Sequence, residues 1–172
     1  MVSPLRILGF DPGTATTGWA CIEQQVSGAK PVLLACGAIR TPANSPLPGR
    51  LQTIHQSVAE LIVSYAPREI AVEELFFAKN RTTAIAVSHA RGVILLAAAQ
   101  AGVNLGEYTP MEVKLALVGY GNADKKQVQQ ILPAHVAASE YPTQDDTADA
   151  VAIALTHLSV IANPYKRAMM AR

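Results

Sequence analysis

The stretch GFDPGTATTGWA, residues 9–20, raises the question on which the interpretation of this chain depends. An apolar segment, residues 5–11, ends on a single carboxylate, Asp11, and a Pro-Gly turn with a run of threonines follows it. An Asp before Pro-Gly is typical of a turn, because its side chain can hydrogen-bond the backbone two residues on. Asp11 could instead bind a metal ion or face a phosphate at the edge of a sheet. One residue does not distinguish these alternatives.

The composition predicts a globular protein with a substantial core. Of the 172 residues, 50% are hydrophobic and 16% are charged, so we expect one domain over residues 1–162 and a loose tail over residues 163–172. The longest apolar run, residues 93–99, is far shorter than a membrane span, and the N-terminus lacks the pattern of a signal peptide. Cys21 and Cys36 are expected to be reduced thiols in apolar segments. These features predict a cytoplasmic protein with no membrane partner.

Hydrophobic periodicity predicts alternating strands and helices. Three strands with short connections favour an antiparallel meander, and a strand that follows a crossover helix commonly returns parallel to the first. The expected fold is therefore α/β, a mixed five-stranded sheet with helices on both faces. The expected strands are residues 5–11, 17–24, 31–39, 69–75 and 103–109, and the expected helices are residues 49–66, 82–100, 110–118, a stretch from residue 124, and 145–161.

Acidic residues recur at three places in this fold. Asp11 ends the first strand, and Glu73 and Glu74 lie late in the fourth, which is expected to run parallel to the first. Alternation along a strand sends Glu73 and Glu74 to opposite faces, so only one of them can point toward Asp11. Buried carboxylates are costly unless they pair with cations, which favours a functional role for these acids.

The third group of acids opens the last expected helix, at Asp145, Asp146 and Asp149. Spacings of three and four residues place pairs of them on one helical face. Asp145 could be a cap in a first turn, but that explanation does less for Asp149, which lies one turn further in. Oxygen ligands from separate elements favour Mg²⁺ or Mn²⁺ over zinc. His157 is expected to be a core residue, and the other three histidines have no partner at metal-binding spacing.

Five segments carry a family resemblance: ILGFDPGTATTGWA, VEELFFAKN, SHARGV, VKLALVGYGNADKKQV and DDTADAVAIALTH. In this order and at this spacing, across residues 5 to about 160, they resemble the RuvC family of bacterial Holliday-junction resolvases. The resemblance implies a ribonuclease H-like fold, a homodimer, and cleavage of four-way DNA junctions by two Mg²⁺ ions, for which Mn²⁺ can substitute. It also implies the RuvA and RuvB branch-migration proteins as partners.

Matched residue by residue, the resemblance also implies the site. The implied catalytic metal ligands are Asp11, Glu73, Asp146 and Asp149. Glu74 and Asp145 match no ligand position. Lys114 and Lys125 match basic active-site positions, which implies contacts with the scissile or flanking phosphates, although either lysine alone could be a solvated surface charge. Lys126, beside Lys125, is expected among the DNA contacts.

The segment after the fourth strand has the composition of a loop that binds DNA. Phe76 matches the base-stacking aromatic of the family, whereas Phe77 could equally belong to the core. Lys79, Asn80 and Arg81 follow directly and are suited to contact phosphates.

The expected helix over residues 82–100 is apolar nearly all round. Burial against its own sheet uses only one face, so the other face needs a partner. Its alanines and Gly92 are small enough to let a second helix approach closely. We expect a second copy of the chain there, and the alternative is another helix of the same chain.

Two other functions are compatible with part of the sequence. The segment DPGTATTG, residues 11–18, also resembles the first phosphate loop of actin-like and sugar kinases, which bind ATP. Those proteins close two such domains around the nucleotide, and this chain has the length of one. A junction-binding protein without catalysis is the second alternative, but such a protein would be expected to have lost acids, and all four are present.

Overall fold

The computed structural model describes residues 3–74 and 81–163, with side chains from residue 84 in the second range. Residues 164–172 of the expected tail therefore lie outside the described residues. The elements are β1 (Leu5–Asp11), β2 (Thr16–Gln24), β3 (Val32–Arg40), α1 (Leu47–Tyr65), β4 (Glu69–Glu73), α2 (Arg81–Ala101), β5 (Asn104–Tyr108), α3 (Pro110–Val118), α4 (Lys125–His135) and α5 (Asp145–Ile161).

The five strands form one sheet in the order β3-β2-β1-β4-β5. β1 and β3 are antiparallel to β2, whereas β4 is parallel to β1 and β5 is parallel to β4. The expected mixed sheet is thus confirmed. Because parallel strands end at the same edge, Asp11, Glu73 and Tyr108, the last residues of β1, β4 and β5, lie along one edge of the sheet.

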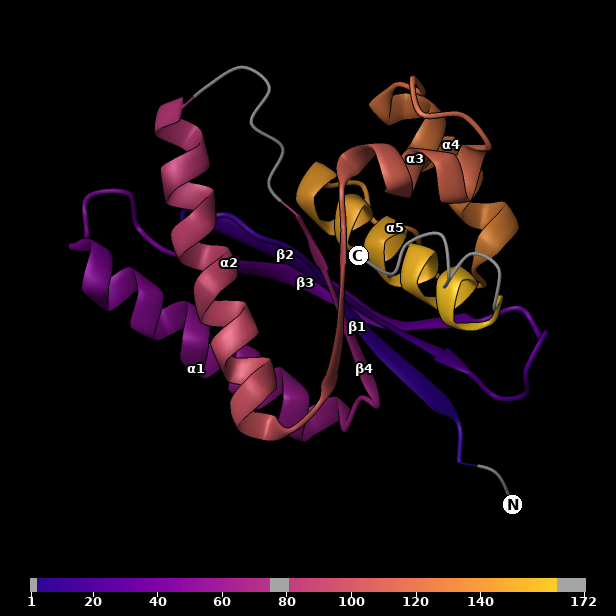
Figure 1. Ribbon diagram of the computed structural model, residues 1–172, viewed down its shortest axis with the longest axis horizontal. Coiled ribbons are helices and arrows are strands. Elements are labelled where there is room, and N and C mark those ends of the chain that lie inside the picture. Colours follow the sequence, from indigo (N-terminus) through magenta and orange to yellow (C-terminus); the bar gives the residue numbers. More distant parts are fainter. Residues whose placement is uncertain (1–2, 75–80, 164–172) are drawn as a thin grey trace.

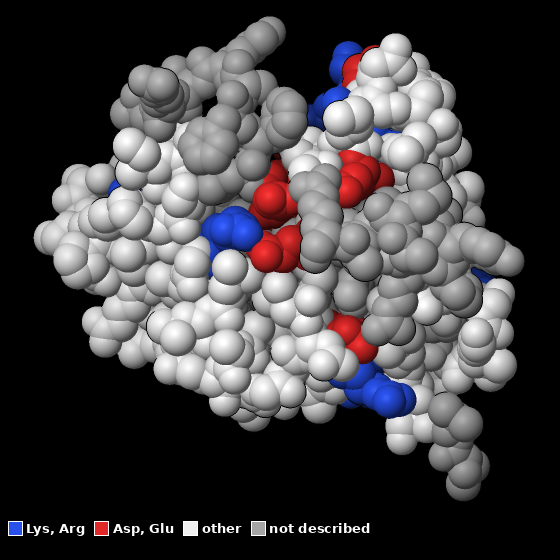
Figure 2. All heavy atoms as spheres, viewed as in Figure 1, with Lys and Arg blue, Asp and Glu red and all other residues white. Residues whose placement is uncertain are grey.

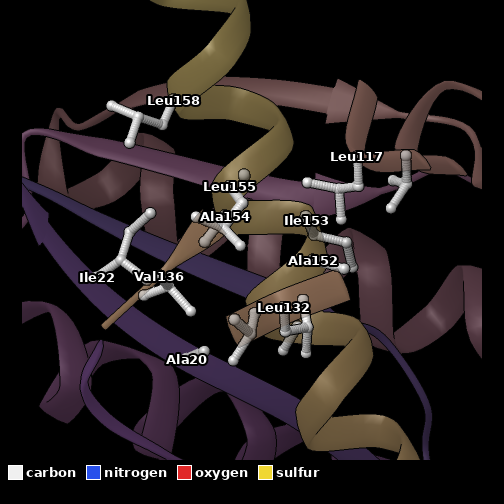
Figure 3. Packing of buried hydrophobic residues seen from close by; sticks show 14 of the residues in the cluster. Ala20, Ile22, Leu117, Leu132, Val136, Ala152, Ile153, Ala154, Leu155 and Leu158 are labelled. Carbon is white, nitrogen blue, oxygen red and sulfur yellow. The ribbon is translucent and has the colours of Figure 1, made fainter. Parts of the chain in front are cut away.

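Helices cover both faces of the sheet, as expected, with α1 and α2 on one face and α3, α4 and α5 on the other (Figure 1). Strand alternation divides the core between these layers: Leu8 and Phe10 of β1 pack with α1 and α2, whereas Ile7 packs with α5. Figure 3 shows side chains of α5 lying against Ile22 of β2 and Leu132 of α4. Helix α5 is therefore the central element of its layer.

Two glycines allow α5 to approach the sheet closely. A Cβ atom on Gly9 of β1 would lie 2.3 Å from the carbonyl oxygen of Ala150, and a Cβ atom on Gly18 of β2 would lie 2.0 Å from that of Asp146. Both distances are far below van der Waals contact, so any side chain at these positions would displace α5. The first turns of α5 therefore lie directly on β1 and β2, beside Asp11, which pairs with Gly18.

Replacing Gly9 with Ala tests this contact. The added methyl group collides with the backbone of α5, so we expect Gly9→Ala to lower the free energy of unfolding by about 1–3 kcal/mol, the usual cost of overpacking. Gly49→Ala is the matched control, because nothing lies within 4 Å of a Cβ there; it should leave stability unchanged or raise it by about 0.5 kcal/mol. Urea denaturation measures both, and equal stability of the two variants would contradict the contact.

Helix α2 is long and strongly apolar. Within the described residues, the stretch Ala84–Ala101 is long and apolar enough to cross a membrane, with a mean hydropathy of 1.4, and 28% of it is buried. Length and composition alone are weak evidence for a membrane span, since helices of soluble proteins also meet these criteria. One face of α2, with Ala90, Ile94 and Ala97, packs in the core with α1 and the sheet. On the other face, Ile85 and Leu96 are exposed.

Candidate active site

Three elements bring the predicted acids to one edge of the sheet. β1 ends at Asp11, its parallel neighbour β4 ends at Glu73, and α5 carries Asp146 and Asp149 in its first turns. Acidic side chains gather between α2 and the α3–α5 layer on the face drawn in Figure 2, with basic side chains beside them. All four carboxylates are half-buried, so water screens their charges only in part.

Burial and mutual repulsion raise the pKa of the two strand carboxylates. The pKa of Asp11 rises to about 7, first through burial and then through the negative charges of Asp149 and Asp146. The pKa of Glu73 rises to about 8, again through burial and then through Asp11 and Asp149. The positive charge of Lys125 opposes both shifts without cancelling them. The site therefore holds more negative charge than the protein itself neutralises.

A capping box directs Lys125 toward these acids. The Asp124 carboxylate accepts a hydrogen bond from the Gln127 backbone N–H, and the Gln127 side chain accepts one from the Asp124 N–H, so α4 begins at Lys125. The Lys125 ammonium lies 2.8 Å from Asp149 Oδ2 and 3.5 Å from Asp145 Oδ2. Among the described residues, Lys125 is thus the cation that contacts the acids of α5.

A cavity of about 210 Å³ opens between β4, α3, α4 and α5. Its polar lining comes from Glu73, Lys114, Lys125 and Asp149, and its apolar lining comes mainly from α3 and α5. Both lysines singled out from the sequence therefore face the same cavity as two of the acids. Such a cavity can hold an anionic group between the lysines and cations between the carboxylates.

The chemistry of these donors fits a hard divalent cation. Carboxylate oxygens from three separate elements are the ligands that Mg²⁺ and Mn²⁺ prefer, and cations would remove the repulsion that raises the pKa of Asp11 and Glu73. Within residues 3–74 and 81–163, no three His, Cys, Asp or Glu side chains converge tightly enough to enclose an ion. A bound cation would draw these carboxylates closer together and would compete with Lys125 for Asp149.

Glu74 and Asp145, the acids next to two of the predicted ligands in the sequence, have different surroundings from those ligands. Glu73, and not Glu74, lines the cavity. Burial and then the charge of Asp11 raise the pKa of Glu73. Asp145 is exposed, and its carboxylate contacts Lys125 and accepts a hydrogen bond of 2.9 Å from Gln129. Sequence reasoning missed Gln129, although its position four residues after Lys125 places both on one face of α4.

Several predicted DNA contacts lie outside the described residues. They are Phe76, Lys79 and Asn80, together with the side chain of Arg81; Phe77, which the sequence left between loop and core, also lies outside the described residues. Lys126 is described and is exposed at the start of α4. It is the neighbour of Lys125 in the chain but does not line the cavity.

The prediction that His157 is a core residue is confirmed. Its Nδ1 lies 2.7 Å from the Tyr108 hydroxyl and its Nε2 lies 3.2 Å from a Glu69 oxygen, and the ring is buried. His55 hydrogen-bonds the Gln100 side chain. These histidines stabilise the fold at positions away from the cavity lining.

Comparison of the whole chain with known proteins identifies its family. Residues 7–157 match the family model described as crossover junction endodeoxyribonuclease RuvC. The chain belongs to the RuvC family. A RuvC crossover junction endodeoxyribonuclease from Desulfitobacterium hafniense is 52% identical over 153 residues, which cover 89% of this chain and 92% of that relative.

Solved structures agree with this assignment. RuvC from Thermus thermophilus, in complex with a Holliday junction substrate, superposes with a TM-score of 0.85 at 36% identity, over 92% of this chain and 95% of that one. The yeast mitochondrial Holliday junction resolvase Ydc2 superposes with a TM-score of 0.67 at 13% identity, over 95% of this chain and 84% of that one, which supports the fold alone. The expected ribonuclease H-like fold is confirmed.

The raised pKa values predict an unusual dependence of stability on pH. Between about pH 4 and about pH 8, folded Asp11 and Glu73 retain protons that the unfolded chain releases, so without metal the free energy of unfolding falls as pH rises. Asp11→Asn removes one of these ionisations. In metal-free buffer it should be more stable than the wild type at about pH 8, and this advantage should shrink toward about pH 4.

Thermal unfolding across this pH range measures the effect. Glu60→Gln, at an exposed position on α1, is the control and should follow the wild-type curve. An Asp11→Asn advantage that stays constant with pH would contradict the assigned pKa shift.

Proposed function

We propose that this protein is a metal-dependent endonuclease that resolves four-way Holliday junctions by paired, symmetric nicks, in homologous recombination and DNA repair. The observation that carries the proposal is the meeting of Asp11, Glu73 and Asp149 at one sheet edge, in a chain of the RuvC family. The related Thermus thermophilus RuvC has been solved with a Holliday junction substrate, which makes four-way junction DNA the substrate to test first.

Two Mg²⁺ ions are assigned to Asp11, Glu73, Asp146 and Asp149, and Mn²⁺ is expected to substitute. When bound, such ions activate a water molecule and neutralise charge on the oxygens of the scissile phosphodiester. The four carboxylates bind in their ionised form, and half-burial limits the screening of their charges by water. Lys114 and the ammonium of Lys125, once it leaves Asp149, would contact the scissile or a flanking phosphate from the cavity wall.

The remaining DNA contacts are assigned to the segment after β4 and to the start of α4. Phe76 is proposed to stack on an unpaired base, while Lys79, Asn80, Arg81 and Lys126 are proposed to bind phosphates. RuvA and RuvB are proposed as the branch-migration partners. The protein is assigned to the cytoplasm.

A paired assay distinguishes this proposal from its alternatives. Wild-type protein is mixed with Mg²⁺ and either a synthetic four-way junction or ATP. We expect two symmetric nicks in the junction and no ATP turnover above background. ATP hydrolysis without nicking would favour the kinase-like alternative, and tight junction binding without nicking would favour a non-catalytic binding protein.

Neutral isosteres of the four acids test the proposed metal ligands. Asp11→Asn, Glu73→Gln, Asp146→Asn and Asp149→Asn should each lower single-turnover cleavage by at least about 100-fold, the scale on which loss of one preorganised electrostatic group acts. Junction affinity in a gel-shift assay should stay the same or rise, because removing negative charge does not weaken attraction to DNA. Glu74→Gln is the matched control and should cleave like the wild type. An inactive Glu74→Gln with an active Glu73→Gln would mean that the wrong glutamate was chosen.

The proposed homodimer uses the uncovered face of α2. Ile85, His89, Gly92, Leu96 and Ala99 are spaced alternately by four and three residues, which places them in one stripe along the helix, and all five are exposed. This repeat is suited to close packing against an identical helix. Two-fold symmetry would also present two active sites to the two strands of like polarity in a junction. A second copy is favoured over lipid because Arg91 of the same helix forms an ion pair with Glu107 of β5.

A charge in this stripe should prevent dimerisation. Leu96 is 52% exposed in the monomer, so Leu96→Asp should leave the fold intact but bury an unpaired carboxylate in the dimer. We expect a monomer in analytical ultracentrifugation, with native circular dichroism and loss of paired incisions. Val63→Asp on α1, where Val63 is 82% exposed, is the control and should remain dimeric. Wild-type protein that sediments as a monomer at micromolar concentration would contradict the proposed interface.

A further inference from the structure

Four side chains of α4 and α5 form an array at the mouth of the site. Lys125 and Gln129 lie on one face of α4, and Asp145 and Asp149 lie on the facing side of α5, each pair four residues apart. Lys125 contacts both aspartates, and the Gln129 amide donates a 2.9 Å hydrogen bond to Asp145 Oδ1. We call these four residues the α4–α5 array. It joins two proposed active-site residues, Lys125 and Asp149, to two residues without an assigned role.

Asp145 is not a helix cap, although it stands in the first turn of α5. The cap position of α5 is Gln144, and no side-chain hydrogen bond caps the helix there. The Asp145 carboxylate instead bridges Lys125 and Gln129 of the neighbouring helix. The orientation of the Asp145 side chain is thus set by its contacts with α4 and not by capping of α5.

Lys125 needs such a partner to stay near the site. It is the first residue of α4, where the positive end of the helix dipole opposes an ammonium group, and its side chain is 47% exposed. Its shorter contact is to Asp149 and its longer one is to Asp145. An Asp149 carboxylate that binds a divalent cation compensates the lysine less, because the cation competes for its negative charge. Among the described contacts of Lys125, the one to Asp145 then remains.

We propose that Asp145 is a positioning residue which, supported by Gln129, holds the Lys125 ammonium beside the active site when Asp149 binds metal. This inference rests on the proposed function, since it takes Asp149 as a metal ligand and Lys125 as a phosphate contact. Asp145 itself touches neither the metal ions nor the DNA. It acts by keeping a partly exposed lysine at the place where the phosphate arrives.

Single-turnover cleavage of a four-way junction at saturating Mg²⁺ gives the first test. Asp145→Asn should cleave about three- to tenfold more slowly with unchanged junction affinity and melting temperature, and Asp145→Glu should recover much of the rate. A purely electrostatic role gives the opposite sign, because loss of a negative charge near the DNA favours binding. Asp145→Asn should cause no further loss when added to Lys125→Met, since it acts through that lysine. Full additivity in this pair, or a wild-type rate for Asp145→Asn alone, would overturn the proposal.

A spectroscopic readout does not depend on cleavage. The Lys125 ammonium can be followed by NMR in protein with isotope-labelled lysines and assigned with Lys125→Arg. On addition of Mg²⁺ without DNA, its signal should stay hydrogen-bonded and ordered in the wild type and should approach that of a free lysine in Asp145→Asn. Glu140→Gln removes an exposed acid outside the array and should behave like the wild type in both assays. A Lys125 signal equally ordered in both proteins would overturn the proposal, whereas absence of wild-type cleavage would overturn the proposed function instead.

Discussion

The backbone contact between α5 and the first two strands is the constraint on which the site depends. Gly9 and Gly18 present no side chain to α5, so the carbonyl groups of Ala150 and Asp146 lie where a Cβ atom would otherwise be. This contact fixes the start of α5 against the end of β1. Asp146 and Asp149 therefore lie within the electrostatic reach of Asp11, although more than 130 residues separate them in the chain. The parallel pairing of β1 with β4 adds Glu73 to the same edge.

The grouping of carboxylates that suits cation binding lowers the stability of the metal-free fold. Burial and repulsion raise the pKa of Asp11 and Glu73 well above the ordinary range, so the folded chain without metal ions resists full ionisation of its own site. The burial of Ile7, Ile22 and the apolar face of α5 offsets this cost. Lys125 neutralises part of the negative charge, but it lies at the exposed mouth of the site and does not cancel the repulsion. The remaining negative charge is available to bind divalent cations.

Much of this could be predicted from the sequence because it depends on local patterns. Period-two and period-3.6 hydrophobicity gave the strands and helices, and the crossover rule gave the parallel pairing of β1 with β4. Alternation along the expected fourth strand, residues 69–75, restricted the choice to one of Glu73 and Glu74, and the family resemblance indicated Glu73. Each of these inferences depends only on residues close together in the sequence or on the order of known motifs.

The rest depended on contacts between distant segments. Nothing near Gly18 in the sequence indicates that it meets the backbone of Asp146, because the two residues become neighbours only when α5 packs on the sheet. Likewise, Asp145 could be a cap by its position, whereas in the fold its carboxylate contacts Lys125 and Gln129 of α4. The apolar pattern of α2 predicted that one of its faces is uncovered. Which residues form that face, from Ile85 to Ala99, became clear only from the residues that pack on the opposite side of the helix.

The central claim is that α5 and the edge of the sheet together form a site for divalent cations. Anomalous diffraction from crystals of the wild-type protein grown with Mn²⁺ tests it most directly. The account predicts two anomalous peaks, ligated by Asp11, Glu73, Asp146 and Asp149, with Lys125 released from Asp149 and still in contact with Asp145. Manganese ligated elsewhere, or no peak at this edge while Lys125 remains on Asp149, would contradict it.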